Sequence, residues 1–266
     1  MDMQRCAKTI AALFFAASLL PATSNAQWRT RWEYTGPKGP DHWTELDPDY
    51  AACNVGKEQS PIDISNAQKA DLPALRFESQ SRPLKGLVNN GHTIRVNYHD
   101  APGNGDSLWV DNERYQLTQF HFHRPSEETI HGKVYAMVAH LMYQSGNGKV
   151  VGVAVLLKAG KPNATIQQIW DHMPMTESKV NADFSHEEET VPGVQLNPGG
   201  LLPATLGYYT YMGSVSAPPC TEGVPWYVLK TPVDISVVQI NAFAKLYPRD
   251  VRQVQALNGR VVKESR

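Results

Sequence analysis

The chain consists of short segments in which apolar and polar residues alternate, separated by frequent glycine and proline. Alternation with a period of two predicts half-buried strands, because successive side chains of a strand point to opposite faces. Glycine and proline number 19 each, and they divide the segments as turn residues do. Six segments rich in β-branched or aromatic residues follow this pattern: 92–98, 107–110, 115–123, 134–143, 149–158 and 226–230. The chain is therefore expected to be mainly β.

The third, fourth and fifth of these segments follow one another closely. Their connections, RPSEETIHGK and QSGNG, contain residues that suit hairpin turns, so the three strands are expected to pair antiparallel in sequence order. Helical patterns are limited to 165–173, with Thr165 as a candidate N-cap, and 236–247, which begins with a cap-like serine. We expect one domain over residues 27–266, with a large twisted, mostly antiparallel central sheet and short peripheral helices.

Residues 1–26 have the pattern of a secretory signal peptide. Arg5 and Lys8 precede an apolar run over residues 10–20, and residues 24–26 (SNA) form a small-x-small cleavage site. The run is too short to cross a bilayer, and no later segment approaches the roughly 18 apolar residues of a membrane helix. The mature chain is expected to be periplasmic or secreted, without membrane insertion after signal removal.

Charge and cysteine content narrow the class of protein further. Without the signal, 23 basic residues face 25 acidic ones, a balance that gives no electrostatic attraction to nucleic acid. Two cysteines remain, Cys53 and Cys220, and an exported chain with a single pair is expected to oxidise it to a disulfide. Two separate buried thiols are the alternative.

The segment QFHFH places two histidines on one face of a strand. Side-chain alternation puts Gln119, His121 and His123 on the same side, although two solvated strand histidines would be the simpler interpretation. The next strand carries His140, and antiparallel pairing beside His121 or His123 would bring three imidazoles within reach of one ion. Three neutral histidines leave a tetrahedral zinc with one open position, the arrangement of catalytic sites. Zn²⁺ is therefore the expected cofactor.

Together with its surroundings, this segment resembles the α-class carbonic anhydrases, in particular the exported bacterial members. The resemblance extends over residues 32–262 and rests on GPDHW at Gly39, QSPIDI at Gln59, NNGHTIRV at Asn89, QFHFH at Gln119, AHL around His140, GSVSAPPCTEG at Gly213 and WYVLK at Trp226. It implies zinc-dependent, reversible hydration of carbon dioxide to bicarbonate and a proton. It leaves an esterase side activity open, suggests a homodimer, and places a disulfide at Cys53 and Cys220.

The resemblance also assigns roles at the reaction centre. His92 occupies the position of the histidine that relays protons to buffer. Glu127 and Ser216 match a hydrogen-bond relay that orients the attacking hydroxide. Considered alone, His92 and Glu127 would be interpreted as ordinary turn residues.

The substrate side of the centre is assigned in the same way. Met142, Val215 and Trp226 match the apolar pocket for carbon dioxide, although each could equally belong to the core. Gln119 shares a strand face with His121 and is expected to hydrogen-bond its second ring nitrogen, which would fix the tautomer of that ligand.

Several positions depart from the family pattern. Ser216 and Ala217 stand where most members have two threonines, and Glu128 replaces a common histidine. Val138 stands where many members have a glutamate that supports the third ligand. Loss of such a carboxylate typically costs about 10–100-fold in metal affinity or activity unless a water or main-chain carbonyl takes over its hydrogen bond, so Val138 predicts a slower enzyme. The adjacent acids Glu127 and Glu128 are expected to raise one pKa if both are buried.

Other functions remain as alternatives. A non-catalytic zinc-binding protein of the same fold is the main one, and retention of three histidines, Glu127 and a hydroxyl at residue 216 argues against it. A zinc peptidase is disfavoured because the sequence lacks His-Glu-x-x-His. A zinc-storage protein would be expected to carry a His-rich loop, which the sequence does not contain.

Overall fold

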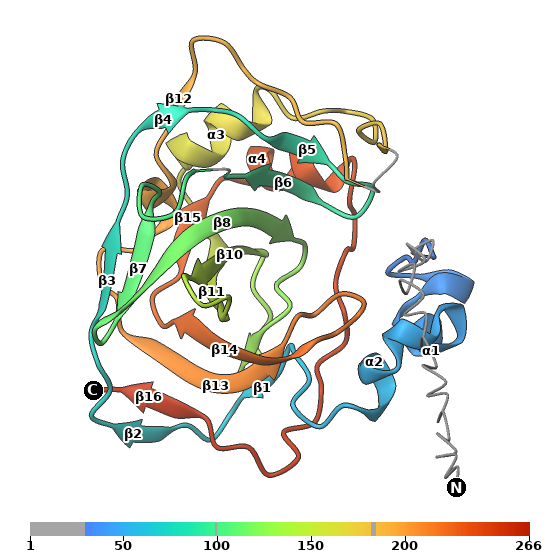
Figure 1. Cartoon of the computed structure of the whole chain (residues 1–266), viewed down its shortest axis with the longest axis vertical. Helices are drawn as coiled ribbons and strands as arrows, with labels where there is room; N and C mark the ends of the chain where they lie inside the picture. Colours follow the sequence, from blue (N-terminus) through green and yellow to red (C-terminus); the bar gives the residue numbers. More distant parts are fainter. Residues whose placement is uncertain (1–29, 99, 182–184) are drawn as a thin grey trace, which may run out of the picture.

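The computed structural model describes residues 30–98, 100–181 and 185–266, so the expected signal peptide lies outside the described residues. A large mixed sheet dominates this part of the chain, with the strand order β2-β16-β13-β14-β11-β10-β8-β6-β5 and with β3, β7 and β15 attached beside it (Figure 1). Its strands are β2 (Gln68–Ala70), β3 (Leu75–Glu78), β5 (Leu87–Asn89), β6 (Ile94–Asn97), β7 (Ser107–Val110), β8 (Glu113–His123), β10 (Met137–Ser145), β11 (Val150–Ala159), β13 (Tyr208–Ser214), β14 (Glu222–Leu229), β15 (Val233–Ile235) and β16 (Lys263–Ser265).

Short elements surround the sheet. Two strand pairs stand apart from it, β1 (Asp63–Ile64) with β9 (Thr129–Ile130) and β4 (Arg82–Pro83) with β12 (Gln195–Leu196). The helices are α1 (Trp43–Leu46), α2 (Ala52–Val55), α3 (Ala164–Trp170) and α4 (Val237–Ala244), with 3-10 turns at η1 (Gly36–Lys38), η2 (Pro40–His42), η3 (Pro48–Tyr50) and η4 (Pro198–Leu201). In Figure 1, α3 and α4 lie together at the top, whereas α1 and α2 lie at the lower right. The predicted fold class is confirmed.

The predicted meander is formed by β8, β10 and β11, which pair antiparallel in sequence order. The β8/β10 register places His140 directly opposite His121 and Val138 opposite His123. β10 begins three residues later than expected because Tyr135 is bound to the preceding connection, where its main-chain oxygen accepts a hydrogen bond from the amide of Ser126 at 3.1 Å. Parallel pairs, such as β11 with β14 and with β15, were not predicted.

The two faces of β8 have different environments. Phe122 points to the face covered by α3 and α4, where its ring contacts Trp170 at 4.8 Å, and Trp170 stacks on Phe243 at 5.5 Å between centroids. Phe120 and Phe122 are fully buried. The histidines of β8 therefore point to the opposite face, as the alternation predicts.

The caps of the two longer helices are only partly as expected. α4 begins at a Ser236 capping box with Gln239, which confirms the cap-like serine. The prediction for α3 was wrong in its first residue: Asn163 is the N-cap, and its side chain accepts from the amide of Ile166 at 3.0 Å. Thr165 lies inside the first turn, because the chain already turns into the helix two residues earlier.

The expected disulfide is present and links α2 to the segment that enters β14. The sulfurs of Cys53 and Cys220 are 2.08 Å apart. Both cysteines are buried beside Trp43 and Tyr50 in a small cluster. Cis peptide bonds occur at Ser60-Pro61, Arg124-Pro125 and Pro218-Pro219.

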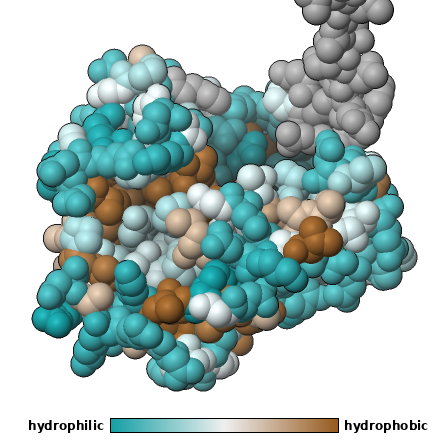
Figure 2. All heavy atoms as spheres, turned by 60° about the horizontal axis from the view of Figure 1, so that its bottom comes forward, coloured by the Kyte–Doolittle hydropathy of each residue, from teal (hydrophilic) through white to brown (hydrophobic). Residues whose placement is uncertain are grey.

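The face shown in Figure 2 is largely hydrophilic, with hydrophobic residues in scattered patches. Among the described residues, no helix is both long and apolar enough to cross a membrane.

Candidate metal centre

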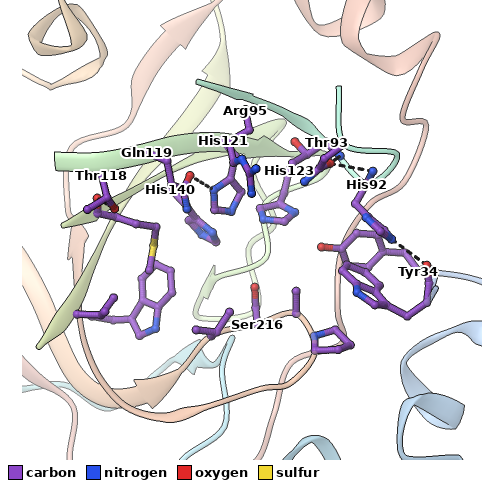
Figure 3. A pocket seen from close by; sticks show the side chains of 18 residues that line it. Tyr34, His92, Thr93, Arg95, Thr118, Gln119, His121, His123, His140 and Ser216 are labelled. Atoms are coloured by element: carbon purple, nitrogen blue, oxygen red, sulfur yellow. Dashed lines mark hydrogen bonds between the residues drawn. The ribbon is translucent and has the colours of Figure 1, made fainter. Parts of the chain in front are cut away.

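Three histidines from two neighbouring strands meet on one face of the sheet. His121 and His123 extend from β8 and His140 from β10, and their ring centroids are separated by 4.9 to 5.4 Å. One nitrogen of each ring lies within 4.8 Å of the corresponding nitrogens of the other two. Figure 3 shows the three rings side by side on one side of a cavity. The geometric prediction for this group is therefore confirmed.

The other nitrogens of the β8 histidines are engaged in hydrogen bonds. Nδ1 of His121 lies 2.8 Å from Oε1 of Gln119, the contact predicted from their shared strand face (Figure 3). Nδ1 of His123 lies 2.7 Å from the main-chain oxygen of Asp250. Because a carbonyl oxygen can only accept, each Nδ1 carries the proton, and the lone pair of each neutral ring is on Nε2. The Asp250 contact was not predicted, since a main-chain acceptor far along the chain gives no local sequence signal.

In His140 the hydrogen-bonded nitrogen is Nε2 instead of Nδ1, and its partner is Glu128. Its Nε2 lies 3.0 and 3.1 Å from the two carboxylate oxygens of Glu128, and both side chains are buried. Burial raises the pKa of Glu128, but the neighbouring His140 lowers it more, so that the pKa is below its usual value. The expectation that the adjacent acids would raise one pKa is therefore wrong for Glu128, because its histidine partner compensates the charge.

The nitrogens that face the centre fit a metal ion. Nε2 of His123 and Nδ1 of His140 are buried and have no hydrogen-bond partner among the described residues. Desolvation lowers the pKa of His121 well below its usual value, and the neighbouring imidazoles lower it further. Burial likewise lowers the pKa of His123. For His140, burial lowers the pKa but the carboxylate of Glu128 raises it more, so that the pKa lies above its usual value. A zinc site of three histidines uses the neutral form of each ring, with its unprotonated nitrogen toward the metal.

A cavity of about 380 Å³ opens above the three histidines. Met142, Val215 and Trp226 line it, and their role in binding carbon dioxide stays a prediction. Met142 and Trp226 also pack into a buried hydrophobic cluster, so they belong to both pocket and core. The Trp226 ring lies close over β11 because residue 152 is glycine, where a Cβ would come within 2.7 Å of the ring.

The proposed relay residues lie near the centre but are not joined to each other. Glu127 is buried, and its Oε1 accepts from the amide of Arg252 at 2.9 Å. Its Oε2 has no hydrogen-bond partner among the described residues and lies 3.6 Å from Nε2 of His123. Ser216 lines the opposite wall, across from the three rings (Figure 3), and makes no hydrogen bond to Glu127. The relay therefore stays a prediction.

His92 lines the same cavity, held against an aromatic wall. Its Nε2 lies 2.8 Å from the main-chain oxygen of Trp32, and the two rings are stacked with centroids 3.7 Å apart. Burial lowers the pKa of His92. The structure thus places His92 at the cavity wall and gives it a fixed orientation.

Arg95 is a cavity residue that was not predicted. It stands directly opposite His121 across β6 and β8, and its Nε is buried without a hydrogen-bond partner among the described residues. Among the described residues that line the cavity there is no aspartate or glutamate, and Arg95 carries the one permanent charge. The alternation of segment 92–98 could have indicated this side chain, since His121 and Arg95 occupy the same face.

Comparisons with known proteins agree with this geometry. The profile of the eukaryotic-type carbonic anhydrases matches residues 38–266. The carbonic anhydrase of Neisseria gonorrhoeae is 39% identical over 255 residues, covering 96% of this chain and 95% of that protein. The α-carbonic anhydrase from Thermovibrio ammonificans, solved with the inhibitor sulfanilamide, superposes with a TM-score of 0.78 at 38% identity, covering 88% of this chain and 99% of that one.

Dioscorin, solved with ascorbate, also shares the fold, with a TM-score of 0.76 and 29% identity over 88% of this chain and 97% of that one. Two findings determine the family of this chain: the family profile matches most of its length, and the similarity to a bacterial carbonic anhydrase extends over nearly all of both chains. The chain belongs to the eukaryotic-type, or α, carbonic anhydrase family.

Proposed function

We propose that the protein catalyses the reversible hydration of carbon dioxide to bicarbonate and a proton, with a zinc ion held by His121, His123 and His140. The observation that carries this proposal is a pair of buried nitrogens, on His123 and His140, that have no hydrogen-bond partner among the described residues and lie beside the third imidazole in an open cavity. Membership of the carbonic anhydrase family supports the same reaction.

The donor set determines the chemistry. When bound by three imidazoles, zinc lowers the pKa of a coordinated water to about 7 and supplies hydroxide at neutral pH, an effect for which carbonic anhydrase is itself the reference example. Gln119 and the Asp250 carbonyl hold the β8 rings in the tautomer that presents Nε2. Preorganised ligands of this kind bind metal with little rearrangement.

The walls of the cavity bind and orient the reactants. Met142, Val215 and Trp226 form an apolar surface beside the histidines, which suits a small apolar molecule such as carbon dioxide. Glu127 is fixed by the Arg252 amide, and its unpaired Oε2 is available to accept a hydrogen bond. We assign the donor to the hydroxyl of Ser216, which would then accept from the attacking hydroxide and fix its orientation.

Proton removal is assigned to His92. With its Nε2 hydrogen-bonded to the Trp32 carbonyl, the neutral ring keeps the Nδ1 lone pair available for a proton arriving through water. Its lowered pKa makes it a weaker proton acceptor than an exposed histidine, but one that remains neutral into mildly acidic solution.

The cellular setting is part of the same proposal. An oxidised pair of buried cysteines fits a protein that folds outside the cytosol, and we place it in the periplasm or outside the cell. Ester cleavage and assembly into a homodimer stay predictions, to be tested by hydrolysis of a neutral nitrophenyl ester and by light scattering.

Stopped-flow measurement of carbon dioxide hydration, with zinc counted on the same sample, tests the proposal. We expect one zinc per chain and hydration that Ser216→Ala slows by on the order of 100-fold without loss of zinc. The non-catalytic alternative predicts one zinc per chain with no hydration. Absence of zinc from a folded, zinc-supplemented sample would contradict both.

A further inference from the structure

The third proposed ligand is oriented by a residue outside its own strand. His140 reaches both oxygens of Glu128 through Nε2, at 3.0 and 3.1 Å, and each side chain is about 1% exposed. We propose that Glu128 is the positioning residue of His140, and that this carboxylate, from the connection between β8 and β10, replaces one that residue 138 would supply. The inference rests on the proposed metal site.

The strand that carries His140 offers no acceptor of its own. Val138 precedes His140 by two residues, so both side chains point to the same face of β10. Val138 is fully buried and packs with Ile62 and Ile64 in a hydrophobic cluster. An apolar side chain here would leave Nε2 of His140 without a partner if no other group reached it, and a buried unpaired donor costs about 1–3 kcal/mol.

The connection that carries Glu128 is held in place by main-chain contacts. The hydroxyl of Ser126 donates to the main-chain oxygen of Glu128 at 2.8 Å and accepts from the amide of Tyr135 at 2.9 Å. The next residue, Thr129, begins β9, which pairs with β1. Glu128 is therefore fixed on both sides, and its carboxylate has a defined position before any metal binds.

This arrangement determines which nitrogen of His140 faces the centre. A carboxylate accepts from Nε2–H, so in the neutral ring the lone pair is on Nδ1. This nitrogen is buried beside His121 and His123 and has no hydrogen-bond partner among the described residues. Carboxylate partners of this kind also raise the basicity of a ligating histidine. The expected loss of affinity from Val138 therefore does not follow, because another acceptor is present.

Substitutions at residue 128 separate hydrogen bonding from charge. Glu128→Gln keeps an acceptor of nearly the same shape and removes the charge, whereas Glu128→Met removes both at similar volume. We expect zinc affinity, measured by chelator competition, to fall modestly in Glu128→Gln and by about 10–100-fold in Glu128→Met. The visible spectrum of the cobalt(II)-loaded protein, which reports coordination geometry, should change in Glu128→Met.

A second substitution distinguishes positioning from general support of the fold. Side chains two residues apart on a strand are separated by about 6.5–7 Å, a distance that a glutamate at residue 138 can span to reach His140. The double variant Glu128→Met/Val138→Glu is therefore expected to regain most of the zinc affinity and the cobalt spectrum. Glu222→Gln is the matched control, since Glu222 accepts from Gln59 and from the amide of Glu58, away from His140.

Two results would overturn the inference: wild-type zinc affinity in Glu128→Met, or a folded double variant that binds zinc no better than Glu128→Met. Zinc affinity is measured without substrate, so the result is independent of catalysis. If the wild-type protein binds zinc and the variants follow the expected order without hydration of carbon dioxide, the proposed function fails and the role of Glu128 stands. If the wild-type protein hydrates carbon dioxide but the zinc affinities of the variants do not follow the expected order, only the role of Glu128 is refuted.

Discussion

The Cys53–Cys220 disulfide should contribute a large part of the stability of the protein. The two cysteines are separated by 167 residues, so the bond closes most of the chain into one loop. In the chain-entropy model, restricting an unfolded loop of this length stabilises the native state by about 5 kcal/mol at 25 °C. Losses measured when native disulfides are removed run from about 2 to 5 kcal/mol. We expect Cys53→Ala/Cys220→Ala to lower the free energy of unfolding by about 3–5 kcal/mol.

The native contacts around the bond should survive the substitution. The main-chain oxygen of Cys53 accepts from Nη2 of Arg252 at 2.6 Å, and that of Cys220 accepts from Nε2 of Gln59 at 3.1 Å. Alanine keeps both carbonyl groups. The effect is therefore expected on the unfolded chain, whose expansion should also increase the dependence of unfolding free energy on denaturant concentration.

Urea denaturation followed by tryptophan fluorescence measures both quantities. Four samples are compared: the wild-type protein and the double variant, each with and without reductant. Reductant should destabilise the wild-type protein to the level of the variant and leave the variant unchanged. A variant within 1 kcal/mol of the oxidised wild-type protein would show that the entropic argument does not apply here.

Four further predictions concern the interior and the cavity. Arg252→Met should lower the free energy of unfolding by at least about 3 kcal/mol. The guanidinium of Arg252 donates to three buried oxygens, and each buried oxygen left unpaired costs about 1–3 kcal/mol. An unchanged urea midpoint would contradict this prediction. His92→Ala should slow hydration in dilute buffer by roughly ten- to a hundredfold, with recovery in concentrated imidazole, and equal rates in dilute buffer would exclude the relay. Because burial lowers the pKa of His92, its neutral acceptor form should persist below pH 6.5, and the acid limb that it controls should lie there. Arg95→Gln should raise the inhibition constant of acetate, a small anion, about two- to fivefold, since a partly exposed charge pair contributes up to ~1 kcal/mol. An unchanged inhibition constant would show that Arg95 does not contact anions bound in the cavity.

The sequence was most informative where local spacing determines geometry. Period-two alternation put His121 and His123 on one face, and the short connection to the next strand brought His140 opposite His121. The same alternation placed Gln119 beside His121. These relations follow from the pleat and from antiparallel pairing, so they require no knowledge of the rest of the chain.

The remaining parts of the centre depend on long-range packing or on choices between equivalent local signals. The carbonyl of Asp250 reaches His123 across 127 residues, and a main-chain group carries no side-chain signature. Glu128 was interpreted as a neighbour that would perturb Glu127, whereas the path of the connection turns its carboxylate toward His140. At α3, Asn163 and Thr165 are both suitable caps, and local sequence alone does not decide between them.

The coordination of bound zinc tests the central claim most directly. X-ray absorption at the zinc edge, on the purified protein with one zinc per chain, should show three imidazole nitrogens at about 2.0–2.1 Å and one oxygen from solvent. His140→Ala should lose one nitrogen from this set. A fourth ligand from a protein side chain, or a spectrum unchanged by His140→Ala, would contradict a metal centre built from the histidines of β8 and β10.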